Sequence, residues 1–117
     1  MNVERLKTCG VNYEAGVHRF GDNVAIYEKY LKKLPESDYI TEAKEALLHK
    51  DVEEAFQVFH KMKAVVGNLS IDELFNQISE ITEELRTGSV DIPETISKME
   101  VVDQKLQVII QFIQMED

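Results

Sequence analysis

The feature of this chain that most constrains its fold is a repeat of apolar residues at helical spacing. Between Pro93 and the C-terminus, apolar residues recur at steps of three or four: Ile96, Met99, Val102, Leu106, Ile109 and Ile113. A second stripe lies between Ser70 and Gly88 and consists of Ile71, Leu74, Phe75, Ile78, Ile81 and Leu85. Side chains at this spacing share one face of an α-helix, so both segments predict amphipathic helices whose apolar face is buried.

Capping residues predict where the neighbouring helices begin and end. Asp51, with Glu54 three residues later, has the pattern of a capping box and predicts the start of a central helix. This helix is expected to weaken or end near Gly67, because glycine is common at helix ends. Ser70 with Glu73 has the same pattern and predicts the start of the following helix.

The first fifty residues predict shorter helices. Asn12 is expected to cap a short helix that ends at Gly21, and Asp22 is expected to cap the next one. Pro35 stops that helix and is acceptable in the first turn of a third segment, which ends near His49. No segment shows the two-residue alternation of a β-strand.

Helices joined by short loops are expected to pack as antiparallel neighbours. We therefore predict an all-α fold: an up-down-up-down antiparallel four-helix bundle with short N-terminal helices. The 117 residues fit a single domain, 1–117. Within it we expect a short N-terminal segment at 1–11 and the bundle at about 12–115.

Composition and charge limit the partners and the compartment. A net charge of −9 argues against nucleic acid and anionic membranes, because a protein that binds either needs a basic patch. The single cysteine, Cys9, cannot form an intramolecular disulfide and points to a reducing compartment. No stretch approaches the ~18–20 uninterrupted apolar residues of a transmembrane helix, and the N-terminus lacks the apolar run of a signal peptide. We expect a soluble, cytoplasmic protein that is a monomer.

The central helix carries a histidine on its polar face. Because each residue of an α-helix turns about 100°, the core-facing stripe lies opposite His60. On the side of His60 lie Gln57, Lys63, Ala64 and Gly67, so we expect the imidazole to be exposed. The ammonium of Lys63, three residues on, is close enough to share an anion bound at the ring. The core-facing stripe consists of Ala55, Val58, Met62, Val65, Val66 and Leu69.

Two interpretations of this face remain open from the residues alone. An exposed neutral imidazole is a competent nucleophile, and a phosphoryl group on it would pair with Lys63. Alternatively, His60 is an ordinary surface histidine and Gly67 is a loosened helix end, since glycine inside a helix costs about 1 kcal/mol relative to alanine. Other chemistries lack support, because His18 and His49 have no partners at metal-ligand spacing. No glycine-rich phosphate loop or G-x-S-x-G motif is present.

The sequence HKMKAVVGNLSI at residues 60–71 resembles the motif H-x-x-K-G-x-x-G-N-L-G-L of histidine-containing phosphotransfer (HPt) domains. The segment 12–34, which includes EAGVHRFGD at 14–22, is similar to the opening segment of that family. The resemblance covers most of the chain, and the family's architecture is also a helical bundle. Ala64 replaces the family's usual glycine after the lysine, and Thr82 stands where the family often has Gln or Glu.

The resemblance implies a role for each matched residue. His60 would be the phosphoacceptor, and Lys63 would steady the phosphoryl group. The chain would relay this group between the aspartates of receiver domains, through a phosphohistidine. The implied docking surface for the partner consists of Gln57, Ala64, Gly67 and Thr82.

The implied partners are response-regulator receiver domains, a hybrid sensor histidine kinase, or both. Mg²⁺ would belong to the receiver, so we expect no cofactor or metal on this chain. There is no ATP-binding segment, and the protein would be a phosphoryl carrier rather than an ATP-dependent kinase. Two alternatives stay open: a non-catalytic HPt-like module that binds a receiver or kinase without phosphotransfer, and a purely structural four-helix bundle.

Overall fold

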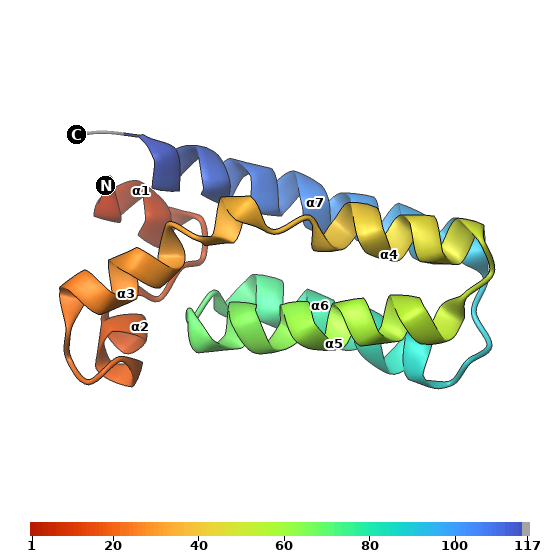
Figure 1. Cartoon of the computed structure of the whole chain (residues 1–117). Helices are drawn as coiled ribbons and strands as arrows, with labels where there is room; N and C mark the ends of the chain where they lie inside the picture. The colour runs from red at the N-terminus through yellow and green to blue at the C-terminus, as the bar shows by residue number, and fades with distance from the viewer. Residues whose placement is uncertain (116–117) are drawn as a thin grey trace.

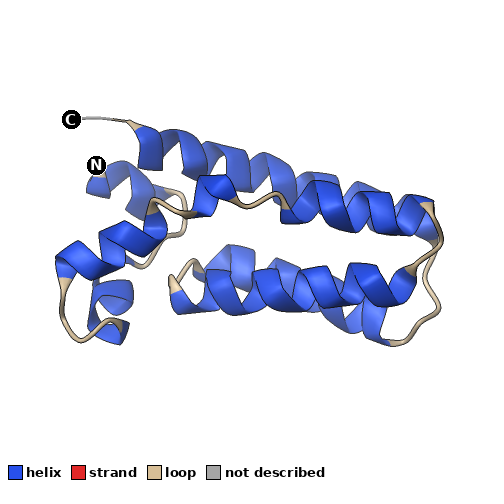
Figure 2. Cartoon of the chain, viewed as in Figure 1, coloured by secondary structure: helices blue, strands red, loops and turns tan. Residues whose placement is uncertain are grey.

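The computed structural model describes residues 1–115 and is helical throughout that range, apart from loops and one isolated antiparallel bridge between Val11 and Ile71. Figure 2 shows these elements. A 3-10 turn, η1, occupies Leu34–Glu36. The α-helices are α1 (Val3–Thr8), α2 (Tyr13–Arg19), α3 (Val24–Leu31), α4 (Tyr39–Leu48), α5 (Val52–Asn68), α6 (Asp72–Arg86) and α7 (Ile92–Gln114).

The four long helices α4 to α7 form an antiparallel bundle (Figure 1). Consecutive helices run in opposite directions, and each packs on two others: α4 on α5 and α7, and α6 on α5 and α7. The predicted all-α helical bundle is confirmed. Its long helices begin at Tyr39, and the helices α1, α2 and α3 lie at the end of the bundle near the last turns of α7.

The apolar stripes predicted from the sequence form one core. On α7 every predicted position except the half-buried Ile96 is buried. On α5 the residues facing away from His60 are buried, and only Val65 is half-exposed. The phenyl ring of Phe59 is fully enclosed, a burial that stabilises the fold by about 1.5–3 kcal/mol.

Two predicted helix caps are found elsewhere. The carboxylate of Asp51 accepts a hydrogen bond from the Glu54 N–H at 3.0 Å, so the cap of α5 is confirmed. The cap of α3 is Asn23 and not Asp22, whose backbone has a φ of +61°. Ser70 does not cap α6 either, because its side chain is buried and its hydroxyl has no hydrogen-bond partner.

The end of α5 explains the misplaced cap. The N–H of Ser70 donates to the Gly67 carbonyl at 3.1 Å, and the N–H of Ile71 donates to the Val66 carbonyl at 3.2 Å. These bonds, with a φ of +58° at Ser70, form a Schellman motif that terminates α5. Ser70 therefore ends one helix and cannot also cap the next, which begins after the fully buried Ile71.

Tyr27 attaches the N-terminal helices to this turn. Its phenolic O–H donates to the Leu69 carbonyl at 2.8 Å, and its ring is fully buried. A Cβ atom at Gly16 would lie 2.3 Å from the Tyr27 ring, so only glycine allows α2 to pass this close. Burial raises the pKa of Tyr27 to about 12. A backbone hydrogen bond from Asn12 to Ser70, 2.8 Å long, adds a second attachment.

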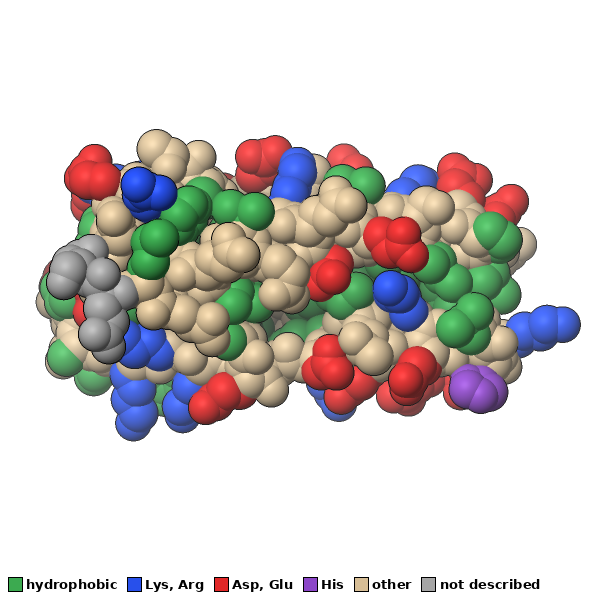
Figure 3. All heavy atoms as spheres, turned by 90° about the horizontal axis from the view of Figure 1, so that it is seen from above, with side chains coloured by type: hydrophobic (Ala, Val, Ile, Leu, Met, Phe, Trp, Pro, Cys, Tyr) green, Lys and Arg blue, Asp and Glu red, His purple; other side chains and the backbone are tan. Residues whose placement is uncertain are grey.

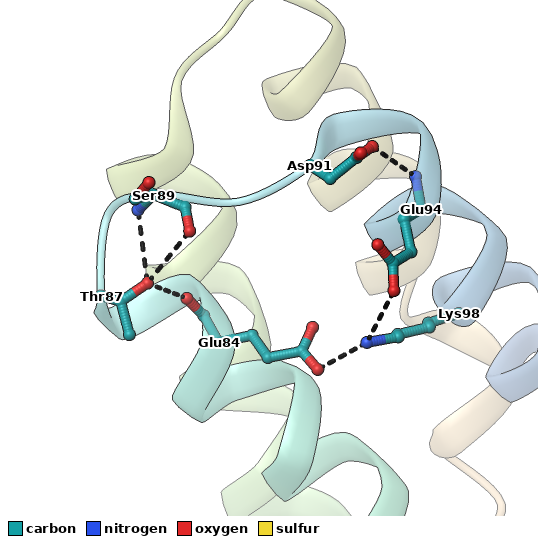
Figure 4. A network of polar contacts seen from close by, with 6 residues as sticks. All are labelled: Glu84, Thr87, Ser89, Asp91, Glu94 and Lys98. Atoms are coloured by element: carbon teal, nitrogen blue, oxygen red, sulfur yellow. Dashed lines mark hydrogen bonds and ion pairs between the residues drawn. The ribbon is translucent and has the colours of Figure 1, made fainter.

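Polar contacts define the turn between α6 and α7, at the other end of the bundle (Figure 4). The ammonium of Lys98 lies 2.6 Å from a Glu84 carboxylate oxygen and 3.7 Å from Glu94. The hydrogen bond to Glu84 raises the pKa of Lys98 above its ordinary value. Asp91 caps α7 by accepting from the Glu94 N–H at 3.1 Å. Exposed ion pairs contribute little stability, so these contacts mainly set the path of the turn.

The charges are unevenly distributed over the surface. On the face seen in Figure 3, Asp and Glu side chains are spread along the molecule, while a group of Lys and Arg side chains gathers at the end that holds the N-terminal helices. Local positive regions therefore exist on a chain whose net charge is −9. Among the described residues, no helix combines the length and the apolar character that a membrane span requires.

Replacing Tyr27 with phenylalanine is expected to lower the free energy of unfolding by about 1–3 kcal/mol, because the change leaves the Leu69 carbonyl without its donor. Urea denaturation followed by circular dichroism measures this difference. Tyr30→Phe is the matched control, since Tyr30 is 45% exposed, and should change stability by less than about 0.5 kcal/mol. Equal stability of the wild type and Tyr27→Phe would show that this hydrogen bond does not hold the N-terminal helices.

Candidate functional site

Helix α5 presents His60 to solvent. The imidazole is exposed, whereas Phe59 and Met62 on the opposite side of the helix are buried against the core. The expected exposure of His60 is therefore confirmed. Within residues 1–115 its ring nitrogens have no hydrogen-bond or ion-pair partner, so they are accessible to a reactant from solvent.

An aromatic stack holds the imidazole. The rings of His60 and Phe56, one turn earlier on α5, are nearly parallel, with an interplanar angle of 26° and centroids 5.8 Å apart. The guanidinium of Arg86, on α6, lies 5.6 Å from the centroid of Phe56. Such contacts stabilise one ring orientation, which lowers the entropy cost of aligning a nucleophile.

Gly67 has a packing role that the sequence left open. Helix α5 includes Gly67 and ends one residue later, at Asn68, so the helix end predicted near Gly67 is confirmed. A Cβ atom at Gly67 would lie 3.0 Å from the Phe75 ring of α6, closer than side chains normally approach. The ammonium of Lys63, which is half-buried, lies 5.8 Å from the centroid of the same ring. The glycine thus lets Phe75 reach α5 and form a surface beneath Lys63.

A hollow of about 420 Å³ adjoins this face, between the end of α2 and the helices α5 and α6. The small side chain of Ala64 and the absence of one at Gly67 keep it open on the α5 side. Lys63 lies at this hollow and also, three residues from His60, on the same side of α5 as the imidazole. The residues that line it are Arg19, Lys63, Ala64, Gly67, Asn68, Asp72, Phe75 and Asn76.

Three of the four predicted docking residues lie on the side of α5 that carries His60. Gln57 is exposed, and its amide donates to the Glu53 carboxylate at 2.9 Å. Ala64 is exposed, and Gly67 is half-buried under Phe75.

The placement of Thr82 on the docking surface is wrong. Its side chain is fully buried, and its hydroxyl donates to the Ile78 carbonyl at 2.7 Å. Thr82 lies on the core-facing side of α6, between Ile81 and Leu85 in the same buried region of the helix. Because its only donor is already used within α6, the hydroxyl is not available to a partner on the surface.

The other histidines form local contacts. The ring of His18 lies 3.1 Å from the Asp22 carboxylate, and the ring of His49 lies 2.8 Å from the Glu45 carbonyl. No group of three or more His, Cys, Asp or Glu side chains within residues 1–115 is arranged to hold a metal ion.

The sequence reasoning missed four residues at this surface. Phe56 precedes His60 by four residues, so helical spacing alone places the two rings on one face and could have identified the stack. Phe75 was assigned to the apolar stripe, but it is half-buried and covers Gly67. Arg86 and Arg19 reach the surface from other helices, and no local pattern indicates their positions.

Comparison with protein-family models, with curated proteins and with solved structures found no match to this chain. The candidate site is therefore described by its own geometry. An exposed imidazole stacks on Phe56, a lysine lies one turn further along the helix, and a hollow with two cationic side chains opens beside them.

The close contact between Gly67 and Phe75 predicts a non-additive effect on stability. In a Phe75→Ala background, Gly67→Ala should stabilise the protein by about 1 kcal/mol through helix propensity. In the wild-type background the new methyl group meets the ring, so the gain should fall by about 0.5–1 kcal/mol. Urea denaturation of the four proteins of this double-mutant cycle measures the coupling. The same effect of Gly67→Ala in both backgrounds would contradict the packing role of the glycine.

Proposed function

We propose that this protein is a histidine phosphotransfer protein that relays a phosphoryl group between receiver-domain aspartates in two-component signal transduction. The observation that carries the proposal is the exposed imidazole of His60 in the middle of α5, with Lys63 one turn away. The resemblance of residues 60–71 to the HPt motif supports the same role. The partners would be cytoplasmic receiver domains, a hybrid sensor histidine kinase, or both.

The chemistry requires little from the bundle beyond a positioned nucleophile. A receiver presents an aspartyl phosphate, and the unprotonated imidazole nitrogen of His60 attacks the phosphorus in line. The new N–P bond forms as the bond between phosphorus and the aspartyl oxygen breaks, and the aspartate leaves as a carboxylate. A second receiver's aspartate then accepts the phosphoryl group by the reverse step. Mg²⁺ held by the receiver neutralises charge on the transferring group.

Lys63 and Phe56 would assist in different ways. The ammonium of Lys63 would pair with the phosphoryl dianion once it is on His60, which favours the phosphohistidine. The stack on Phe56 keeps the imidazole from rotating freely before and after transfer. Neither group forms or breaks a bond, so both act by positioning and by charge.

One observation favours a second candidate function. The hydroxyl of Thr82 donates within α6, and the imidazole of His60 has no hydrogen-bond partner in the described part of the chain. A phosphoryl group on His60 would thus receive no hydrogen bond from Thr82, which suits an HPt-like module that binds a receiver or kinase without phosphotransfer. Transfer of labelled phosphate from a receiver to this protein distinguishes the two candidates.

Incubation with a panel of receivers carrying labelled aspartyl phosphate is expected to transfer label to this protein. The product should be acid-labile and base-stable, as N-linked phosphate is. His60→Gln should abolish the label, and the matched change His18→Gln, at another exposed histidine, should leave it intact. Receiver binding without label on the wild type would favour the interaction module, and label that survives His60→Gln would place the acceptor elsewhere.

Lys63→Ala is expected to slow transfer or shorten the phosphohistidine lifetime about two- to tenfold, because one charge pair with the dianion is lost. Lys61→Ala is the matched control, since Lys61 is exposed and points away from the face of His60. Time courses of label gain and loss measure both effects. Equal behaviour of the Lys63→Ala and Lys61→Ala proteins would refute the assigned role.

A further inference from the structure

The hollow beside His60 contains a cation, Arg19, that phosphotransfer at the imidazole does not use. We call it the Arg19 hollow; it is formed by the eight lining residues given above. Arg19 comes from the last turn of α2, whereas Lys63 comes from the middle of α5. Within the described chain, neither cation forms an ion pair with a carboxylate. Lys98 and Lys105, by contrast, are each paired with glutamates.

The other lining groups are suited to a small anionic side chain. Asn68 and Asn76 contribute carboxamides, whose N–H groups can donate to an oxygen anion. Phe75 forms an apolar wall beside them. Asp72 is the single carboxylate among the eight lining residues, and it accepts a hydrogen bond from the side-chain amide of Asn12 at 3.5 Å. Two cations against one carboxylate give this hollow a positive charge on a chain whose net charge is −9.

The position of the hollow separates its role from that of His60. Gly67 is seven residues beyond His60, which corresponds to about 10 Å along the helix axis. A phosphoryl group on the imidazole therefore lies near Lys63 and away from the part of the hollow beyond Gly67. A typical protein partner covers about 800 Å² of surface, so a receiver docked over His60 would also cover the hollow.

We propose that the Arg19 hollow binds an aspartate or glutamate side chain of the partner protein that docks over His60. This inference rests on the proposed function, because it assigns a second contact to the same partner. The guanidinium of Arg19 is the principal anchor, since its planar donors match both oxygens of a carboxylate. Attraction at one defined point also orients the partner over this otherwise acidic surface.

The test uses the receiver that labels the wild-type protein fastest in the panel. Isothermal titration calorimetry with the unphosphorylated receiver should show that Arg19→Ala weakens binding about three- to tenfold. Asp72→Asn should have the opposite effect and tighten binding by about twofold, because it removes the repelling carboxylate. Arg19→Lys keeps the charge but loses the planar guanidinium. Its affinity for the receiver should lie between those of Arg19→Ala and the wild type.

A control variant and two further measurements complete the test. Arg5→Ala removes an arginine that lies over Phe112, outside the hollow, and should leave the affinity within about twofold of the wild type. The effect of Arg19→Ala should shrink at high salt. In transfer assays, Arg19→Ala should raise the half-saturating receiver concentration more than it lowers the rate at saturation. Circular dichroism confirms that each variant is folded.

The outcomes distinguish this inference from the function on which it rests. If the wild type is labelled at His60 but Arg19→Ala and Arg5→Ala bind alike, the hollow is not a recognition site and the relay function stands. Weaker binding by Asp72→Asn in a folded protein would also overturn the inference. A wild-type protein that neither binds nor accepts label from any receiver would remove both proposals.

Discussion

The arrangement of this molecule depends on the burial of one side of α5 between α4 and α6. Ala55, Phe59 and Val66 are fully enclosed there, and this apolar contact fixes the rotation of the helix about its axis. Once that rotation is set, the side chain of His60 must face solvent. The polar face is thus exposed by the packing of the opposite face, and the same α5–α6 contact brings Phe75 onto Gly67. Exposure and packing are two results of one constraint.

Periodicity predicted the helices and their buried faces well, because burial of apolar side chains is the dominant force and repeats along the chain. It also placed His60 correctly. One error lies where a single residue serves two neighbouring elements. Ser70 carries a good capping pattern for α6, but the Schellman motif that ends α5 needs its backbone in the left-handed region. The resemblance to HPt domains placed Thr82 on the docking surface, whereas the packing of α6 turns its side chain inward.

Contacts between residues distant in the sequence could not be predicted in the same way. Arg86 reaches Phe56 and Lys63 reaches Phe75 because α5 and α6 are antiparallel at one particular register. That register follows from the detailed fit of side chains such as Phe75 over Gly67. A single sequence gives the residue types but not the distances in space between residues that are far apart along the chain. The hollow next to Lys63 is a further case, since Arg19 belongs to a helix whose position relative to the bundle is set by Tyr27.

The attachment through Tyr27 has a consequence for the way the surface is assembled. Arg19 is carried by the short helix α2, whereas His60 and Lys63 belong to the long helix α5 of the bundle. The hydrogen bonds from Tyr27 to Leu69 and from Asn12 to Ser70 help to hold the two groups in register. Local opening of the N-terminal helices would separate them without unfolding the bundle. A ligand that contacts both parts must therefore stabilise the closed arrangement. Its apparent affinity includes the free-energy cost of keeping the two parts together.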